Sequence, residues 1–182
     1  MCGIAGIFTF APGVSAPSDQ ELARVSDFQR RRGPDDHATW RSEDQRCLFD
    51  HRRLAIIDLS PGGRQPMLSA DGDLAITFNG EIYNYLELRA QLEQEGCRFR
   101  SASYTEVILQ LYARHGDGAM ARLRGMFAFA LWDRGKGAVL LARDPYGIKP
   151  LYYAERDGVL RFASSAKALM AGKALPDEVN PA

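Results

Sequence analysis

The most continuous hydrophobic stretch of the chain covers residues 126–132, in which every side chain is apolar. A strand with one face in water would alternate apolar and polar side chains, so this run predicts a strand buried on both faces. Residues 133–137 predict a turn, and residues 138–142 then return as an apolar partner strand. We therefore expect a hairpin with other layers of structure above and below it.

Other short hydrophobic runs predict further strands, over residues 3–10, 37–41, 46–49, 54–57, 74–78, 151–154 and 159–163. Apolar side chains at three- and four-residue spacing instead predict helices over residues 18–31, 85–95 and 105–115, with a short one over residues 164–171. The economical architecture is an α+β fold in which two stacked antiparallel sheets lie between helices, because it covers both faces of the strand at 126–132. The chain shows no internal repeat, so we expect residues 1–182 to form a single domain.

Composition excludes several function classes. Lys and Arg total 23, as do Asp and Glu, so no net charge attracts the chain to nucleic acid or to an anionic membrane. No apolar run is long enough to span a bilayer, and the first residues lack the basic segment of a signal peptide. The three scattered cysteines, Cys2, Cys47 and Cys97, do not suit a disulfide framework, so we expect a reducing, cytoplasmic location.

Cys2 stands directly behind the initiator methionine and becomes the N-terminal residue once Met1 is removed. It then carries a thiol with a pKa of about 8.5 and an α-amine with a pKa of about 7.7–8.0. Near neutral pH the amine is partly unprotonated and can accept the proton of the thiol, directly or through one water. Cys2 is therefore a candidate nucleophile, and the alternative is a small apolar residue that opens a strand.

Cleavage of a carbonyl compound also needs donors for the oxyanion and groups that hold the substrate. Asn79 and Gly80, at the expected end of the strand over residues 74–78, offer a side-chain amide and a backbone N–H. The alternative for this dipeptide is a plain turn, but a helix follows it rather than a matched strand. Arg53 can hold a carboxylate in a bidentate fork and Glu81 can hold an ammonium group, although either can also be a surface charge.

Other chemistries lack the residues they need. The histidines His37, His51 and His115 have no cysteine or carboxylate at ligand spacing, so we expect no metal site. Asp144 and Lys149 flank a Pro-Tyr-Gly segment and are interpreted as charges that fix a loop. No glycine-rich phosphate loop is present, so no nucleotide and no other cofactor is expected.

Six blocks of sequence carry a stronger signal than any single residue. They are Cys2-Gly3-Ile4-Ala5-Gly6, Arg32-Gly33-Pro34-Asp35, His51-Arg52-Arg53-Leu54-Ala55-Ile56-Ile57-Asp58, Phe78-Asn79-Gly80-Glu81-Ile82-Tyr83-Asn84, Leu123-Arg124-Gly125-Met126-Phe127-Ala128-Phe129 and Arg143-Asp144-Pro145-Tyr146-Gly147-Ile148-Lys149-Pro150-Leu151. In this order they resemble the glutaminase domain of asparagine synthetases, a class II glutamine amidotransferase of the N-terminal nucleophile hydrolase type. The resemblance implies a four-layer αββα sandwich that hydrolyses glutamine to glutamate and ammonia through a γ-glutamyl thioester.

Position by position, the resemblance implies a role for each candidate. Cys2 would attack the side-chain amide of glutamine while its own α-amine transfers the proton, and Asn79 with Gly80 would form the oxyanion hole. Arg53 would bind the carboxylate of the substrate, and Glu81 would face its α-amine. The backbone that lines the pocket would come from Leu54, Ala55, Ile56 and Ile57.

One position departs from the family pattern. The family has an aspartate where this chain has Tyr104, and that aspartate would bind the α-ammonium group of glutamine. Tyr104 is therefore a candidate binding residue, and two alternatives to a glutaminase stay open: an amidohydrolase for a different amide, and a non-catalytic docking module. The family also has a C-terminal synthetase domain that receives the ammonia. We expect it to be absent from this chain and to be a partner, as a domain or a subunit.

Overall fold

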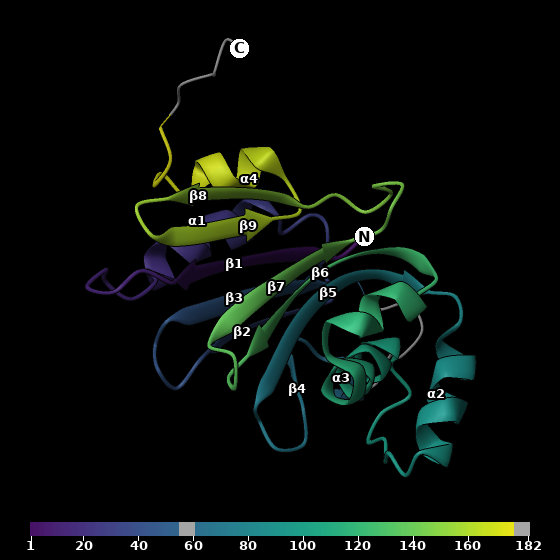
Figure 1. Cartoon of the computed structure of the whole chain (residues 1–182). Coiled ribbons are helices and arrows are strands. Elements are labelled where there is room, and N and C mark those ends of the chain that lie inside the picture. The colour runs from purple at the N-terminus through teal and green to yellow at the C-terminus, as the bar shows by residue number, and fades with distance from the viewer. Residues whose placement is uncertain (55–60, 177–182) are drawn as a thin grey trace.

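The computed structural model describes residues 1–54 and 61–176, which form four stacked layers of the expected α+β class (Figure 1). One antiparallel sheet has, in spatial order, the five strands β2 (Asp36–Arg41), β3 (Cys47–Arg53), β1 (Gly3–Thr9), β9 (Val159–Ala163) and β8 (Tyr152–Arg156). The other antiparallel sheet has the four strands β4 (Met67–Leu68), β5 (Leu74–Ile82), β6 (Gly125–Asp133) and β7 (Ala138–Arg143). The predicted pair of stacked antiparallel sheets is confirmed.

Helices form the two outer layers (Figure 1). The five-stranded sheet is covered by α1 (Asp19–Phe28) and α4 (Ala166–Ala171), and the four-stranded sheet by α2 (Tyr85–Gln94) and α3 (Tyr104–His115). Two short 3₁₀ segments, η1 (Pro61–Gly63) and η2 (Gly116–Arg122), complete the described elements. No helix within residues 1–54 and 61–176 is long and apolar enough to cross a membrane.

Strand β6 explains why the sheets stack. Its side chains alternate between two cores, and none of its six central residues is more than 5% exposed. The core beneath α3 contains Phe127, Phe129 and Leu131, and the core between the sheets contains Ala128, Ala130 and Trp132. Because burial of a large apolar side chain stabilises a fold by about 1.5–3 kcal/mol, this strand holds three of the four layers together.

Two strands are longer than their hydrophobic runs predicted. The prediction that β5 ends before Asn79 is wrong, because β6 pairs alongside it as far as Gly125 and keeps Ile82 buried. Likewise, β3 continues to Arg53 because β1 and β2 flank it on both sides. Of the strand expected over residues 54–57, Leu54 lies just after β3, and the other three residues are outside the described part of the chain.

Helix α1 ends at Phe28, three residues earlier than expected. It begins with a cap in which Oγ of Ser18 accepts the backbone N–H of Glu21 at 3.3 Å, an interaction typically worth about 0.5–2 kcal/mol. At its other end Gln29 turns inward, and its side-chain amide donates to the carbonyl oxygen of Ile4 at 3.2 Å. This tertiary contact ends the helix and connects it to the first strand.

Candidate active site

Cys2 lies immediately before β1, with its side chain half-buried. Its Sγ is 3.3 Å from the backbone N of Leu54, which donates to it, and 3.6 Å from the carbonyl oxygen of the same residue. The two segments meet because β1 and β3 pair with Gly3 opposite Arg52. The backbone of Leu54 therefore holds the sulfur of Cys2 beside the end of β3.

Three side chains hold the backbone around Cys2 in place. Nε of Arg32 donates to the carbonyl oxygen of Cys2 at 3.1 Å, and the amide of Gln29 donates to that of Ile4. From the other side, Oγ of Ser164 accepts the N–H of Ile4 at 3.0 Å. The sequence pattern did not indicate these roles of Arg32, Gln29 and Ser164. Arg32 opens one of the six sequence blocks, which is the signal that could have identified it.

Side chains alternate between the two faces of a strand, and on β3 and β5 this alternation directs further candidate side chains toward the space between the sheets. Ala75 belongs to the core between the sheets, so Asn79 and Glu81 face the same way from β5. Phe49 belongs to that core as well, so Arg53 faces it from the end of β3. These three polar side chains therefore project from the two facing sheets toward one region.

Asn79 is 2% exposed, and its Nδ2 is buried without a hydrogen-bond partner in the described part of the chain. A buried amide donor with no acceptor costs about 1–3 kcal/mol. Such a group is expected where a ligand supplies the missing acceptor. Asn79 is thus prepared to donate to an oxygen that the chain itself does not provide.

The backbone N–H of Gly80 points away from strand β6. Just beyond the ladder of β5 and β6, the N–H of Tyr83 donates to the carbonyl oxygen of Arg124 at 2.7 Å, and bonding residues alternate along an antiparallel pair. The N–H of Phe78, which points the same way as that of Gly80, donates to Oε1 of Gln65 at 2.6 Å. The N–H of Gly80 therefore points to the side of β5 away from β6, where it is a candidate second donor beside Asn79.

Glycine is required at this position for a steric reason. A Cβ at Gly80 would collide with the carbonyl oxygen of Met126 and would lie 2.7 Å from Cα of Phe127. Gly80 and Phe127 are directly opposite in a non-hydrogen-bonded pair, where two antiparallel backbones come closest. The close approach of β6 therefore fixes where the donor of Gly80 lies.

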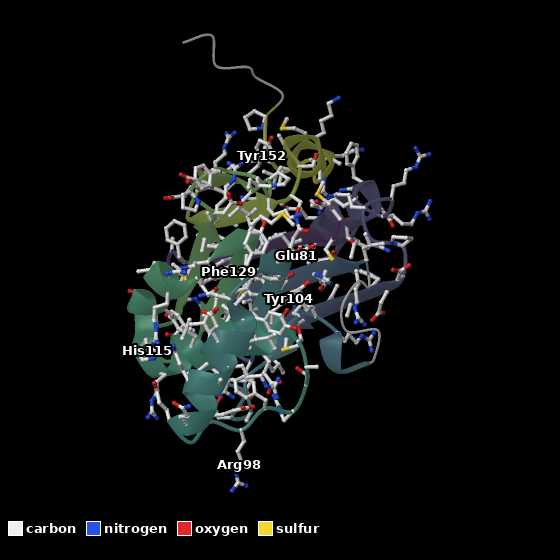
Figure 2. The ribbon with its side chains drawn as sticks, turned by 90° about the vertical axis from the view of Figure 1, so that its right-hand side faces the viewer. Glu81, Arg98, Tyr104, His115, Phe129 and Tyr152 are labelled. Carbon is white, nitrogen blue, oxygen red and sulfur yellow. The ribbon has the colours of Figure 1, made fainter. Side chains whose placement is uncertain are left out.

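Tyr104 begins helix α3 and lies beside Glu81 in the middle of the face shown in Figure 2. Its ring packs against Phe78 and Tyr85 with centroid distances of 5.2 and 6.1 Å. Burial, followed by negative charge on Cys2 and Glu81, raises the pKa of Tyr104 to about 12, and Arg53 opposes this. The phenol is therefore neutral at physiological pH and within electrostatic reach of Cys2, Glu81 and Arg53.

His51 connects the two sheets behind these residues. Its Nε2 lies 3.1 Å from the carbonyl oxygen of Phe78, the residue before Asn79. Burial lowers the pKa of His51 to about 4, so the ring is neutral and Nε2 carries the donated proton. This bond couples the strand of Arg53 to the strand of Asn79, a role that the sequence did not indicate because the two residues are far apart in the chain.

The loop after β7 has the role that its charges suggested. Asp144 is buried and accepts backbone N–H bonds from Phe127, Tyr146, Ile148 and Lys149 at 2.9–3.2 Å. Asp144 therefore fixes the loop, as predicted.

Clusters that could bind a metal ion were also sought. Residues 1–54 and 61–176 contain no group of three or more histidine, cysteine, aspartate or glutamate residues that could hold an ion.

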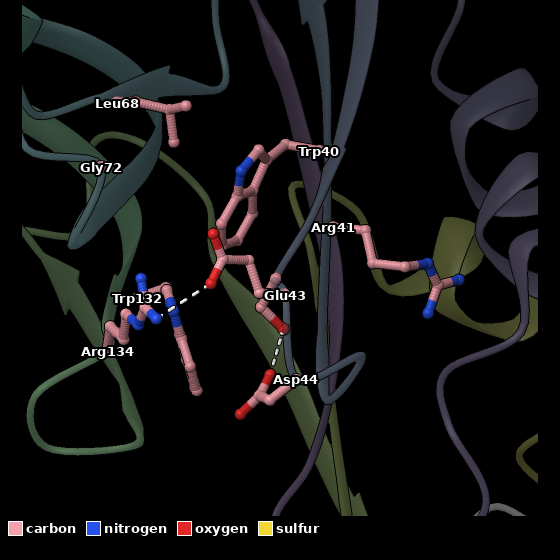
Figure 3. Close-up of a pocket in the computed structure, with 9 residues that line it drawn as sticks. Trp40, Arg41, Glu43, Asp44, Leu68, Gly72, Trp132 and Arg134 are labelled. Atoms are coloured by element: carbon pink, nitrogen blue, oxygen red, sulfur yellow. Dashed lines mark hydrogen bonds and ion pairs between the residues drawn. The ribbon is translucent and has the colours of Figure 1, made fainter.

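The structure thus places Cys2, Leu54, Asn79 and Glu81 around one end of the space between the sheets, with Arg53, Gly80 and Tyr104 beside them. The predicted pocket residues Ala55, Ile56 and Ile57 lie outside the described residues. A separate cavity of about 530 Å³ contains none of these candidates (Figure 3). It is lined by Trp40 and Trp132, and two of its charged groups, Glu43 and Arg134, form an ion pair at 2.9 Å.

The chain is similar in sequence to known proteins. A family model described as a glutamine amidotransferase domain matches residues 1–182. Asparagine synthetase [glutamine-hydrolyzing] 1 of Bacillus subtilis is 43% identical over 93% of this chain and 27% of its own length. Amidase chry2 of Gibberella zeae is 37% identical over 94% of this chain and 26% of its own length. The chain spans about a quarter of the length of these curated relatives.

A solved structure shares the fold at lower sequence identity. The glutamine phosphoribosylpyrophosphate amidotransferase from Bacillus subtilis, complexed with ADP and GMP, superimposes with a TM-score of 0.78. It is 21% identical, and the match covers 94% of this chain and 44% of that one. This likeness supports the four-layer arrangement independently of the close relatives.

Proposed function

Because the chain belongs to the family of glutamine amidotransferase domains, we propose that it hydrolyses glutamine to glutamate and ammonia with Cys2 as the nucleophile. The observation that carries the proposal is the buried amide of Asn79, which has no acceptor in the described chain and lies on the strand that also carries Gly80 and Glu81. It is a donor prepared for an oxyanion. The proposed domain comprises residues 1–182.

The nucleophile forms when Met1 is removed. Met1 is 53% exposed, and its loss converts the backbone nitrogen of Cys2 from an amide into a free α-amine. With a pKa of about 7.7–8.0 that amine accepts the thiol proton near neutral pH. The N–H of Leu54 then stabilises the thiolate at the 3.3 Å distance seen here.

The thiolate adds to the side-chain amide carbon of glutamine and places negative charge on its oxygen. Nδ2 of Asn79 and the N–H of Gly80 donate to that oxygen, and one such donor typically contributes about 2.7–4 kcal/mol to the transition state. The protonated α-amine returns its proton to the leaving nitrogen, ammonia departs and a γ-glutamyl thioester remains on Cys2. A water molecule, deprotonated by the same amine, hydrolyses the thioester to glutamate.

The substrate is held by charges that project from the two sheets. Arg53 binds the α-carboxylate of glutamine, and Glu81 faces the α-ammonium group. Tyr104 forms the wall beside Glu81, and the backbone of Leu54 lines the pocket. Ala55, Ile56 and Ile57 are proposed to continue that lining.

A second candidate function follows from Tyr104. A phenol that stays neutral cannot balance an ammonium charge, so the site offers an α-amine one carboxylate, Glu81. An amide substrate that keeps the carboxylate and lacks the α-amine fits such a site as well. Relative activity on glutamine and on glutaramate, its analogue without the α-amine, separates the two candidates.

We further propose a synthetase domain or subunit as the partner that consumes the ammonia. The support is that several relatives are named glutamine-hydrolysing asparagine synthetases, and that this chain spans about a quarter of their length. Ammonia released by the thioester step is a neutral nucleophile, which suits the amidation of an activated carboxylate.

Labelling with a diazo-ketone analogue of glutamine tests the nucleophile. Protein from which Met1 has been removed should gain one adduct by intact mass, and the Cys2→Ala variant should gain none. Cys97→Ala is the matched control, because it removes the other half-buried thiol and should be labelled like the parent. If the parent forms no adduct at high reagent concentration, the proposed mechanism is wrong.

A further inference from the structure

Strand β5 has a partner strand on only one side where it enters the proposed active site. Strand β6 pairs with it along its whole length, whereas β4 pairs with it only at Ala75 and Ile76. The backbone N–H groups of Phe78 and Gly80 point to the β4 side. Beyond Ile76 the described residues provide no strand on that side, so the backbone groups of Phe78 need other partners.

Two buried side chains bind Phe78 in place of a strand. Oε1 of Gln65 accepts the N–H of Phe78 at 2.6 Å, and Nε2 of His51 donates to its carbonyl oxygen at 3.1 Å. Gln65 and His51 are 7% and 1% exposed. The register of β4 and β5, continued by two residues, would put Gln65 opposite Phe78, so its side chain bonds where a backbone group would otherwise do so. Phe78 directly precedes Asn79, so distant segments fix the backbone that carries the proposed oxyanion donors.

Gln65 also reaches the helix that carries Tyr104. Its Nε2 donates to Oγ1 of Thr105 at 3.3 Å, in the first turn of α3, where Thr105 is fully buried. The two bonds fix the orientation of the amide, because a reversed amide would set an NH₂ group against the N–H of Phe78. One side chain therefore joins the strand of Asn79 to the helix of Tyr104.

We propose that Gln65 is a positioning residue for the proposed oxyanion donors, Asn79 and Gly80. It acts through the backbone: Gln65 and His51 hold the peptide groups on both sides of Phe78, which sets the direction of the two donors before the substrate binds. A misplacement of about 1 Å in such a group can cost about 100-fold in rate. The inference rests on the proposed glutaminase reaction, because that reaction assigns the oxyanion to these donors.

The kinetics of Gln65→Met test this role. Methionine keeps a side chain of similar length and removes both hydrogen-bonding groups of the amide. The kcat for glutamate release should fall at least tenfold, whereas the KM for glutamine should change less than threefold, because oxyanion donors act mainly in the transition state.

Ser42→Ala is the matched control. Oγ of Ser42 is buried and accepts the N–H of Cys47 at 2.9 Å, at the end of β3 farthest from Arg53. The variant loses a bond of the same kind as Gln65→Met does, and its kcat should stay within twofold of the parent. An equal fall of kcat in the two variants would overturn the proposal, because it would show a general effect of lost stability.

A double-variant cycle separates positioning from an independent contribution. In the Asn79→Ala background the side chain that Gln65 is proposed to orient is absent, so Gln65→Met should lower kcat less than threefold further. The same tenfold loss in both backgrounds would show that Gln65 does not act through Asn79, and the proposal would be wrong.

Thr105 offers a second test if Gln65→Met does not fold. Thr105→Val removes the acceptor of Nε2 of Gln65 and leaves the amide free to turn, whereas Thr105→Ser keeps the hydroxyl. The kcat of Thr105→Val should fall at least threefold with little change in KM, and Thr105→Ser should stay within twofold of the parent. Equal kcat values for these two variants would contradict the proposal.

NMR of the substrate-free protein tests the positioning without any activity. In Gln65→Met, or in Thr105→Val if the first does not fold, the backbone order parameter of Gly80 should fall from the rigid range, about 0.85, toward the flexible range below about 0.6. In Ser42→Ala it should not change. A rigid Gly80 would overturn the proposal even if kcat falls. If the parent releases no glutamate, the proposed function fails, and this measurement alone decides whether Gln65 positions these groups.

Discussion

Replacing Asn79 by alanine should affect stability and activity in different ways. In the absence of substrate the Nδ2 of Asn79 is buried without an acceptor among the described residues, so the folded protein bears the cost of an unpaired donor. During catalysis the same group is proposed to bind the oxyanion. The Asn79→Ala variant therefore loses both the energetic cost of the unpaired donor and the proposed binding of the oxyanion.

The two effects can be estimated separately. Relief of an unsatisfied buried donor is worth about 1–3 kcal/mol. The small cavity left by the truncation offsets part of this gain, so the free energy of unfolding should stay within about 1 kcal/mol of the parent or rise above it. Loss of one oxyanion donor should lower kcat by about 100- to 1,000-fold.

Thr77→Val is the matched control on the same face of β5, two residues before Asn79. The hydroxyl of Thr77 is satisfied, because it donates to the carbonyl oxygen of Asp50 at 3.1 Å. Its removal should therefore cost about 1 kcal/mol of stability and leave kcat nearly unchanged. Urea unfolding measures the first quantity, and the rate of glutamate release at saturating glutamine measures the second.

The opposite pattern would refute the reasoning. If Asn79→Ala loses more than about 2 kcal/mol of stability while kcat falls less than tenfold, Asn79 is a structural residue. The oxyanion would then have to be bound by other donors, and the proposed mechanism would lose its main support.

Three further substitutions test other parts of the structure. Tyr104→Asp restores a carboxylate beside the proposed ammonium position and should lower the KM for glutamine at least tenfold, whereas Tyr104→Asn should not; an unchanged KM in the aspartate variant would place Tyr104 outside that position. Gly80→Ala forces a Cβ into the backbone of β6 and should cost about 1–3 kcal/mol of stability in urea unfolding, whereas Gly118→Ala, which meets open space, should cost less; equal stabilities would contradict the close contact. Burial lowers the pKa of His51 to about 4 from 6.5, so the unfolded chain binds this proton first and stability should be lost as the pH falls from 6.5 to 4. The total is about 3 kcal/mol, and His51→Asn should remove this component while His115→Asn keeps it; identical pH profiles in both variants would show that His51 does not contribute.

The hydrophobic pattern identified the layers because side chains that are buried between layers have to be apolar. A strand covered on both faces has no position that tolerates a polar side chain, so β6 appeared as an unbroken apolar run. The pattern was less reliable at strand ends. In β5 the polar residues Asn79 and Glu81 looked like the end of a strand, but pairing with β6 continues past both of them.

The candidate site was assembled from residues whose chemical type was informative in the sequence. Cys2 was identified by its position behind Met1, and Arg53, Asn79 and Glu81 by functional groups that suit an amino acid substrate. Arg32 was missed as a positioning residue, because its bond to the carbonyl oxygen of Cys2 joins positions 30 residues apart. No local pattern records such a contact.

Residue types and their order along the chain thus established which reactive groups are present and that two sheets must stack. Whether a group is free to act depends on hydrogen bonds made by distant segments. Alternation in the ladder with β6 turns the N–H of Gly80 away from that strand, and Nδ2 of Asn79 donates to no atom of the described chain. Unsatisfied donors and acceptors arise from long-range packing, so they became visible only when the sheets were assembled.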